Sequence, residues 1–443
     1  MKNIDSGNRM YEWARSLFPI CRSITGEGVR ETLAFIKKQA PELTIKALKS
    51  GTEVFDWTIP QEWLIRDAYI ITPSGDKIAC FKDSNLHVVG YSSAINQVMS
   101  LEDLEPFLYS LPDMPSAIPY VTSYYQRCWG FCLSQEDRNK LTPGDYHVVI
   151  DSEHFDGELN YGEIILPGSS DKEVLISTYI CHPSLANNEL SGPVVTLELF
   201  NKMKQMKNRK YTYRFVFIPE TIGSISYLSL HYQSLKENVV AGFVVTCVGD
   251  DRAFSYLPSR HGSTLADKAA LLALEELAPN YLAYSFLDRG SDERQYCAPG
   301  IDLPVCSIMR SKYGEYPEYH TSLDNLSLIS PAGLAGALKV IYKAIEYIEI
   351  NDVYQVTVLC EPQLGKRGLY PTLSSTMQEY DEVITLTNFL AYCDGKHDLF
   401  EIAKIIDLIL WVNIFILDLL SNLLNLFFMD QILKIAFLKL SII

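Results

Sequence analysis

Residues 174–192 read VLISTYICHPSLANNELSG, an apolar run that leads directly into a polar turn. Such a run is typical of a strand buried on both faces of a sheet, and we expect a helix to follow near 192–206. The same order recurs downstream, where YRFVFI and VVAGFVVTCV flank a helix predicted near 223–236. Apolar strands that alternate with helices predict an α/β domain with a mixed sheet, over residues 166–350.

The remaining chain divides into three further segments. Residues 1–45 carry two helical patterns that we expect to pack back onto the α/β domain, and residues 46–165 hold short β-rich runs separated by turns. One of these short strands is expected at 86–89 and another at 161–166. Residues 351–443 contain a helix, a glycine turn at 394–395 and a second helix, as in a winged-helix-like domain.

Composition limits the possible functions. The 443 residues contain 38 basic and 54 acidic side chains, which gives a net charge of −16. A chain with this charge and no basic run is not expected to bind nucleic acid, because the phosphate backbone would be repelled. Its ten cysteines include no C-x-x-C pair, and its first residues lack the apolar run of a signal peptide. We therefore expect reduced thiols and a cytoplasmic location.

Three polar side chains fall at or beyond the ends of predicted strands. His182 follows the first apolar strand, Glu220 follows the next, and His320 lies in a loop before the helix at 331–350. Ligands bind at the carboxyl edge of open α/β sheets, so these residues can meet. Histidine nitrogen and carboxylate oxygen are ligands that zinc favours, and a glutamate beside zinc can deprotonate water. Each residue alone has an ordinary structural explanation; together they indicate a metal site.

Longer motifs carry a family resemblance. They are CRSITGEGVRETL at 21–33, ANNELSG at 186–192, GSDERQY at 290–296 and YHTSLDN at 319–325. In this order, with Glu220 between the second and third, they resemble the bacterial di-zinc aminopeptidases. The chain more closely resembles the aminopeptidase-like proteins of bacterial polysaccharide-biosynthesis loci. That resemblance implies a peptidase fold with an inserted β domain and a carboxy-terminal winged helix.

The resemblance also implies roles for individual residues. His182 matches the first zinc histidine, Glu220 the general base and His320 the last zinc histidine, while Asp292 matches a residue that lines the site. Glu293, beside it, is a candidate for substrate binding together with Asp292, and Asp250 is a further candidate near the site.

Three anionic ligands of the di-zinc enzymes are replaced, by Asn188, Thr221 and Thr246. Two zinc ions would leave four positive charges largely uncompensated, so one zinc is expected rather than two. Its oxygen ligand is left open: Glu189 is preferred on charge, whereas Asn188 occupies the matching position.

These features predict a zinc-dependent hydrolase of the aminopeptidase type that acts on a small molecule or peptide with a free amine. One alternative is a zinc enzyme that processes acyl or amide groups on amino-sugar intermediates. Another is a catalytically degenerate binding protein. A homo-oligomer is compatible with all three.

Two segments have open interpretations. The aromatic run SYYQRCWGFCLS, 123–134, is either the core of the small β domain or a lid that supplies stacking and an anion contact to substrate. From about 408 the sequence becomes strongly apolar, and it has neither glycine nor proline after Gly395. A reading-frame change explains this tail better than a membrane span over 408–429, although the tail could contact a membrane or another chain.

Overall fold

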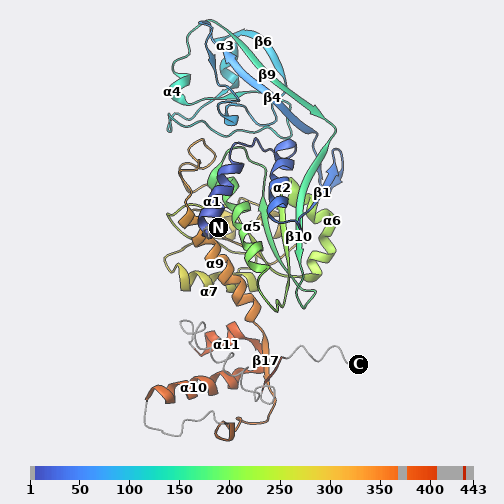
Figure 1. Ribbon diagram of the computed structural model, residues 1–443, viewed down its shortest axis with the longest axis vertical. Helices are drawn as coiled ribbons and strands as arrows, with labels where there is room; N and C mark the ends of the chain where they lie inside the picture. Colours follow the sequence, from blue (N-terminus) through green and yellow to red (C-terminus); the bar gives the residue numbers. More distant parts are fainter. Residues whose placement is uncertain (1–4, 368–376, 407–432, 436–443) are drawn as a thin grey trace. The chain divides into compact units, whose positions relative to one another are not determined.

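The computed structural model describes residues 5–367, 377–406 and 433–435, and the chain forms two compact units, Met1–Ile345 and Glu346–Ile443. The first unit is built on one eight-stranded sheet with the order β1-β10-β12-β11-β13-β16-β14-β15 (Figure 1). Its strands are β1 (Thr44–Lys49), β10 (Glu158–Leu166), β11 (Glu173–Tyr179), β12 (Thr212–Ile218), β13 (Val239–Val244), β14 (Ser255–Leu257), β15 (Leu282–Ala283) and β16 (Val305–Met309).

The centre of this sheet is parallel, and the next strand on either side runs antiparallel to it. Strands β12, β11, β13 and β16 run parallel, whereas β10 is antiparallel to β12, and β14 to β16. Every residue of β11 is buried, which requires cover on both faces. The predicted α/β class with a mixed sheet is confirmed.

Helices flank the sheet. Helix α5 packs on β11 and β12, α1 packs on α5, α2 on β10, and α7 on β13 and β16. The helices of this unit are α1 (Ser6–Leu17), α2 (Glu27–Gln39), α3 (Leu101–Leu104), α4 (Gln135–Arg138), α5 (Ser191–Met203), α6 (Ile222–Asn238), α7 (Leu265–Leu277), α8 (Glu293–Tyr296) and α9 (Pro331–Ile350), of which α9 continues into the second unit.

The β-rich segment is inserted between two strands of the main sheet. Strands β1 and β10 pair antiparallel from Thr44 opposite Glu163 to Lys49 opposite Glu158. Between them lies a separate four-stranded sheet, β5-β4-β9-β6 (Figure 1). The strands between β1 and β10 are β2 (Glu53–Val54), β3 (Trp57–Thr58), β4 (Glu62–Ile71), β5 (Lys77–Ile78), β6 (Ile95–Ser100), β7 (Leu108–Tyr109), β8 (Phe131–Cys132) and β9 (Asp145–Phe155).

Two details differ from the sequence-based expectation. The run at 161–166, assigned to the β-rich segment, lies in β10 of the main sheet, because its residues pair with both β1 and β12. The strand expected at 86–89 is instead a short 3-10 helix, Asn85–His87, which the Ser84 hydroxyl caps by accepting the Leu86 N–H. A side-chain cap of this kind competes locally with strand formation.

The second unit contains α10 (Met377–Tyr392), α11 (Leu399–Ile405) and a three-stranded sheet in the order β18-β17-β19. Its strands are β17 (Val353–Val356), β18 (Asp394–Asp398) and β19 (Leu433–Ile435). Gly395 has φ 79°, as the predicted turn requires, and Asp398 caps α11. Two helices around a small sheet agree with the expected winged-helix-like domain.

Most of the apolar tail, including residues 408–429, lies outside the described residues. The exception is β19, which pairs with β17 and so belongs to the sheet of the second unit. Among the helices that the structure describes, none has both the length and the apolar character needed to cross a membrane.

A close approach at the start of α5 gives a test of the fold. A Cβ atom on Gly192 would lie 2.4 Å from the carbonyl oxygen of Val245 and 2.5 Å from the Thr178 hydroxyl. We expect Gly192→Ala to lower the free energy of unfolding by about 1–3 kcal/mol, measured by urea denaturation. Gly336→Ala in α9 is the control, since its nearest neighbour is the flexible end of Arg310, 3.3 Å away. Equal stability of both variants would contradict the proposed crowding.

Candidate functional site

The candidate site lies where β11 and β12 end side by side. These strands are parallel neighbours, with Tyr179 paired to Ile218, so the residues that follow them leave the sheet at the same edge. His182 follows β11 and Glu220 follows β12, and the His182 Nε2 atom lies 3.6 Å from Glu220 Oε2. Two of the residues predicted from strand ends are therefore adjacent.

The His182 ring is oriented by Glu189. The Glu189 Oε2 atom lies 3.0 Å from His182 Nδ1 and accepts the His182 backbone N–H at 3.0 Å. Its other oxygen lies 3.1 Å from Nε of Arg22, and both side chains are fully buried. A carboxylate that accepts from Nδ1 leaves Nε2 free to bind a metal. Glu189 therefore contacts the Nδ1 side of the His182 ring.

Cys181 adds a third potential ligand on the Nδ1 side of His182. Its sulfur, His182 Nδ1 and a Glu189 oxygen all lie within 4.8 Å of one another. Burial, however, raises the pKa of the Cys181 thiol to about 11. The guanidinium of Arg22 also supplies the positive charge that pairs with Glu189. The Nε2 side of His182 is therefore the more favourable position for a cation.

His320 faces the same site from a separate loop. Its ring centroid lies 5.5 Å from that of His182, and its backbone has φ 55°, an unusual value for a residue with a side chain. Burial, followed by the charge of His182, lowers the pKa of His320 to about 3. The imidazole is therefore neutral, and its buried Nε2 atom has no hydrogen-bond partner among the described residues. These are the properties of a metal ligand.

Asn188, which precedes Glu189, is held in place by its backbone. It is in a single π-helical turn, Ala186–Leu190, whose N–H groups at 186, 187 and 188 donate to the carboxylate of Asp324. Asp324 is itself buried and accepts from the Tyr316 hydroxyl at 2.9 Å. π-Helical turns inside helices often occur at functional sites.

The amide of Asn188 takes part in a short polar chain. Its Oδ1 accepts from the Tyr179 hydroxyl at 2.8 Å, which lies 2.6 Å from the Thr246 hydroxyl, while its buried Nδ2 has no partner among the described residues. Amide oxygen and nitrogen are assigned by hydrogen bonding. If the two atoms are exchanged, the side-chain nitrogen donates to the Tyr179 hydroxyl, Tyr179 donates to Thr246, and Thr246 donates to the backbone carbonyl of Asn188. The side-chain amide oxygen of Asn188 is then free to act as a ligand.

Glu220 is the acidic group of this site that solvent can reach. Its side chain is 22% exposed, whereas that of Glu189 is fully buried. Ser291 donates to Glu220 Oε1 at 2.7 Å, and burial raises the pKa of Glu220 against the opposing charge of His182. A carboxylate with a raised pKa beside an open position suits a general base.

The other acidic candidates, Asp292, Glu293 and Asp250, accept hydrogen bonds from neighbouring backbone and side-chain groups. Asp292 accepts from the Thr221 N–H and the Ser224 hydroxyl, both at 2.8 Å, and so holds Thr221 at its unusual φ of 63°. Burial, and then the charge of Glu220, raise the pKa of Asp292 to about 7. Glu293 accepts from the N–H groups at 290 and 291 and from Tyr313. Asp250 bonds to Asn187 and Ser311, away from both histidines.

A segment of the inserted domain completes the site. The Tyr120 N–H donates to the His320 carbonyl at 2.8 Å, and Ile118 and Ser322 exchange two further hydrogen bonds. The Tyr120 ring lies edge-on to both histidines, at 5.4 Å from His182 and 5.1 Å from His320. This tyrosine therefore contacts the site from a position about fifty residues before β11.

The chain is similar to known proteins over most of its length. Residues 11–351 match the family described as a domain of unknown function (DUF4910), and residues 352–424 match the winged helix-turn-helix. A Clostridium acetobutylicum protein described as a polysaccharide biosynthesis protein with an aminopeptidase-like domain is 44% identical over 400 residues, 90% of this chain and 91% of its own length.

Solved structures give the same picture of the fold. The crystal structure of a Clostridium acetobutylicum protein described as a peptidase is 41% identical with a TM-score of 0.86, covering 97% of this chain and 96% of its own. A zinc aminopeptidase from Bacillus subtilis is 14% identical with a TM-score of 0.56, covering 78% of this chain and 95% of its own. The latter likeness concerns the fold alone.

Several contributors to the site could not be identified from the sequence one by one. Arg22 lies within the motif at 21–33, which indicated the family but no role for this residue. Tyr120 precedes the aromatic run at 123–134, and Ser291 lies in the motif at 290–296. The motifs indicate Arg22 and Ser291 only as members of a family pattern, and Tyr120 lies in none of the motifs. Each of the three reaches the site only through tertiary contacts.

The buried pair of Arg22 and Glu189 can be tested by removing one charge or both. We expect Arg22→Met to lower the free energy of unfolding by about 3–5 kcal/mol, since it leaves a buried carboxylate without its partner. The double variant Arg22→Met, Glu189→Leu should lose less than the single variant. Arg66→Ala is the control: its ion pairs with Asp151 and Glu153 are exposed, so stability should hardly change. A double variant as unstable as the sum of its singles would contradict charge compensation.

Proposed function

The chain belongs to the family described as a domain of unknown function (DUF4910), and on that premise we propose that it is a zinc-dependent hydrolase of the aminopeptidase type. One observation carries the proposal: His182 Nε2 lies 3.6 Å from the partly exposed carboxylate of Glu220, and the His182 ring lies 5.5 Å from that of His320, whose buried Nε2 has no partner among the described residues. The substrate is an amide or peptide with a free amine, which suits the acidic site.

The residues present fit one zinc ion. The ligands would be His182, His320 and the amide oxygen of Asn188, a donor set with two imidazoles, an oxygen and room for a further ligand. Glu189 takes a positioning role in place of the ligand role that its charge suggested, since both its oxygens are engaged with Arg22 and His182. A zinc ion bound here would supply Lewis acidity to the carbonyl of the substrate.

Glu220 performs the proton transfers in this proposal. Its carboxylate takes a proton from the attacking water and delivers it to the leaving nitrogen as the amide bond breaks. The Ser291 hydroxyl fixes Oε1 of Glu220 and leaves Oε2 facing His182. The raised pKa of Glu220, caused by burial, makes it a stronger base than an exposed carboxylate.

The site favours one ion over two. Thr246 is occupied in the polar chain with Tyr179 and Asn188, and Thr221 accepts a hydrogen bond from Nη2 of Arg294 at 2.9 Å. The guanidinium of Arg294 therefore lies at one of the positions that carry an anionic ligand in the di-zinc enzymes. A second divalent cation there would meet a positive charge.

A second candidate keeps this site and changes the substrate. The Clostridium acetobutylicum relative is described as a polysaccharide biosynthesis protein, which favours an amide or acyl group on an amino sugar. The water, the base and the leaving nitrogen keep the same roles. Product analysis with aminoacyl amides and with acylated amino sugars in parallel separates the two candidates, since only the true class gives turnover.

Removing the base should separate catalysis from metal binding. We expect Glu220→Gln to lower kcat by about 10²–10⁴-fold or more, because the amide cannot accept the proton of water. Metal content, measured by elemental analysis, should stay at that of the unaltered protein. Undiminished turnover in this variant would overturn the role of Glu220. Ser291→Ala, which removes only the hydrogen bond to Glu220, should have a smaller effect.

The proposed ligands predict opposite changes in zinc affinity. We expect His320→Ala to abolish stoichiometric zinc binding. Asn188→Asp should strengthen it by about tenfold or more, because a carboxylate adds negative charge to the donor set. Competition with a coloured chelator measures both changes without an activity assay. Zinc binding that is indifferent to both substitutions would show that the ion, if any, is held elsewhere.

A further inference from the structure

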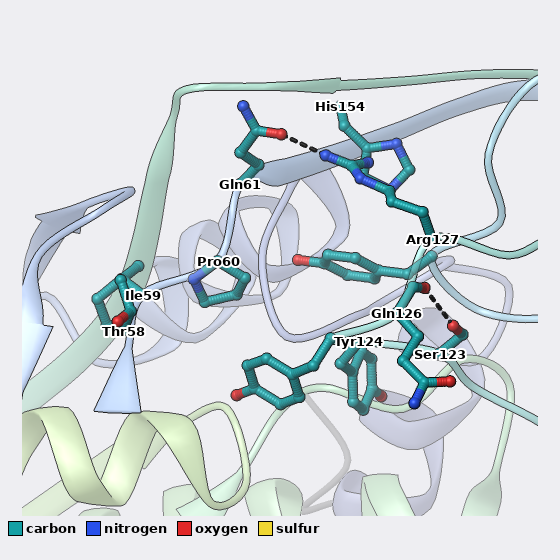
Figure 2. Close-up of a pocket in the computed structure, with 11 residues that line it drawn as sticks. Thr58, Ile59, Pro60, Gln61, Ser123, Tyr124, Gln126, Arg127 and His154 are labelled. Atoms are coloured by element: carbon teal, nitrogen blue, oxygen red, sulfur yellow. Dashed lines mark hydrogen bonds between the residues drawn. The ribbon is translucent and has the colours of Figure 1, made fainter. Parts of the chain in front are cut away.

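A cavity of about 250 Å³ opens between loops of the inserted domain, close to the candidate metal site (Figure 2). It is smaller than the roughly 300–1,000 Å³ typical of sites for drug-sized ligands, so it suits a single ring. The cavity is lined by Thr58, Ile59, Pro60, Gln61, Tyr91, Ser123, Tyr124, Tyr125, Gln126, Arg127 and His154.

Aromatic rings line part of this cavity. The Tyr91 ring lies 5.3 Å from that of Tyr124, and the Tyr125 ring lies 5.5 Å from that of Trp57. Tyr125 nevertheless keeps 56% of its surface exposed, although it is a large aromatic residue. Exposed aromatic rings beside a cavity offer flat apolar surfaces to a ligand.

Basic and amide groups line another part. Gln61, Arg127 and His154 lie together in Figure 2, on the side away from Tyr124, and Arg127 donates to the side-chain amide oxygen of Gln61. The Gln61 amide nitrogen in turn donates to Asp156, the carboxylate nearest along this chain of contacts. Burial, and then the positive charge of Arg127, lower the pKa of His154. Within the described part of the chain, neither Arg127 nor His154 has an ion-pair partner.

The cavity is linked to the candidate metal site through the side chains of two tyrosines. Tyr124 lines the cavity, and its hydroxyl lies 2.6 Å from the hydroxyl of Tyr120. Tyr120 contacts the rings of both His182 and His320. A ligand in the cavity would thus be separated from the histidines by two tyrosine side chains.

Hydrogen bonds hold the backbone beside the cavity in a defined conformation. Gly90 exchanges hydrogen bonds with Val121 and Ser123, at 2.9 Å each, which fixes the segment that carries Tyr120 and Tyr124. The next residue, Tyr91, has φ 66°, a strained value for an aromatic residue. Strained residues of this kind concentrate at ligand-binding and catalytic sites.

We propose that this cavity binds a sugar ring that carries a negatively charged group, as the part of the substrate remote from the bond that is cleaved. The tyrosine rings stack on the apolar C–H face of the ring, the guanidinium of Arg127 pairs with the anionic group, and the Gln61 side chain contacts ring hydroxyls. The role of the cavity in catalysis rests on the proposed function, whereas the binding of the sugar does not. An uncompensated arginine in a chain of net charge −16 fits an anionic ligand.

The test is a titration of the full-length protein with glucuronate, glucose 1-phosphate, glucose and N-acetylphenylalanine, followed by calorimetry or ligand-observed NMR. We expect at least one anionic sugar to bind about tenfold or more tightly than glucose. The two anionic sugars distinguish a carboxylate from a phosphate. Equal affinity for glucose, or binding of N-acetylphenylalanine alone, would overturn the proposal, and the latter would favour a peptide.

Variants assign the binding to this cavity. Arg127→Ala should remove the preference for the anionic sugar, and Tyr125→Ala should weaken every sugar while the preference remains. Arg66→Ala, on an exposed arginine of the same domain, is the matched control and should change neither. An unchanged preference in Arg127→Ala, with the fold checked by thermal unfolding, would contradict the site.

The same titration on zinc-depleted protein and on Glu220→Gln separates this proposal from the proposed function. Anionic-sugar binding should persist in both, because neither change touches the cavity. If the unaltered, zinc-loaded protein binds anionic sugars but hydrolyses no amide, the proposed function alone is rejected. Hydrolysis that persists in a protein with no sugar preference would reject the cavity alone.

Discussion

The arrangement of the site depends on one buried positive charge, the guanidinium of Arg22. It donates to the carbonyls of Leu17, at the end of α1, and His182, after β11, and it pairs with Glu189. A buried charge is costly unless its partners are all in place, so these three segments must come together for the fold to form. Because Glu189 also accepts from His182, the same requirement fixes the direction in which His182 presents its free nitrogen.

The position of His320 in the site is fixed by a different set of contacts. His320 comes from a loop, and its position depends on the segment 118–124, which is bonded to the His320 loop at one end and to Gly90 at the other. Backbone strain marks both ends of this arrangement. Tyr91 lines the cavity, the ring of His320 faces that of His182, and Thr221 follows Glu220; all three have positive φ. Backbone strain at these positions indicates that their geometry is maintained at a cost in stability.

Much of this fold could be read from the sequence because its signals are local. The apolar run at 174–180 predicts a buried strand, and the residue that follows a parallel strand must lie at the sheet edge; this is why His182 and Glu220 could be paired in advance. Tyr120 and Arg22 could not be placed that way, since their roles depend on contacts with residues distant in the sequence. The prediction of a strand at 86–89 is wrong for a local reason: the Ser84 side chain caps a 3-10 helix there. A hydrophobic pattern carries no information about such a cap. The choice between Glu189 and Asn188 likewise required knowledge of where Arg22 lies.

The position of the insertion explains how one domain can add to the site of another without disturbing it. The inserted chain leaves the main sheet after β1 and returns at β10, and β1 pairs along its full length with β10 at the sheet edge. Arg30 of α2 forms a 2.6 Å ion pair with Glu62 of β4, which ties the insertion to the helical layer. The central strands β11 and β12 can therefore keep the geometry of His182 and Glu220, while the segment 118–124 sets a fixed separation between cavity and histidines. Under the two proposals above, a substrate that occupied both the cavity and the metal site would have to match that separation, so the placement of the insertion would contribute to specificity.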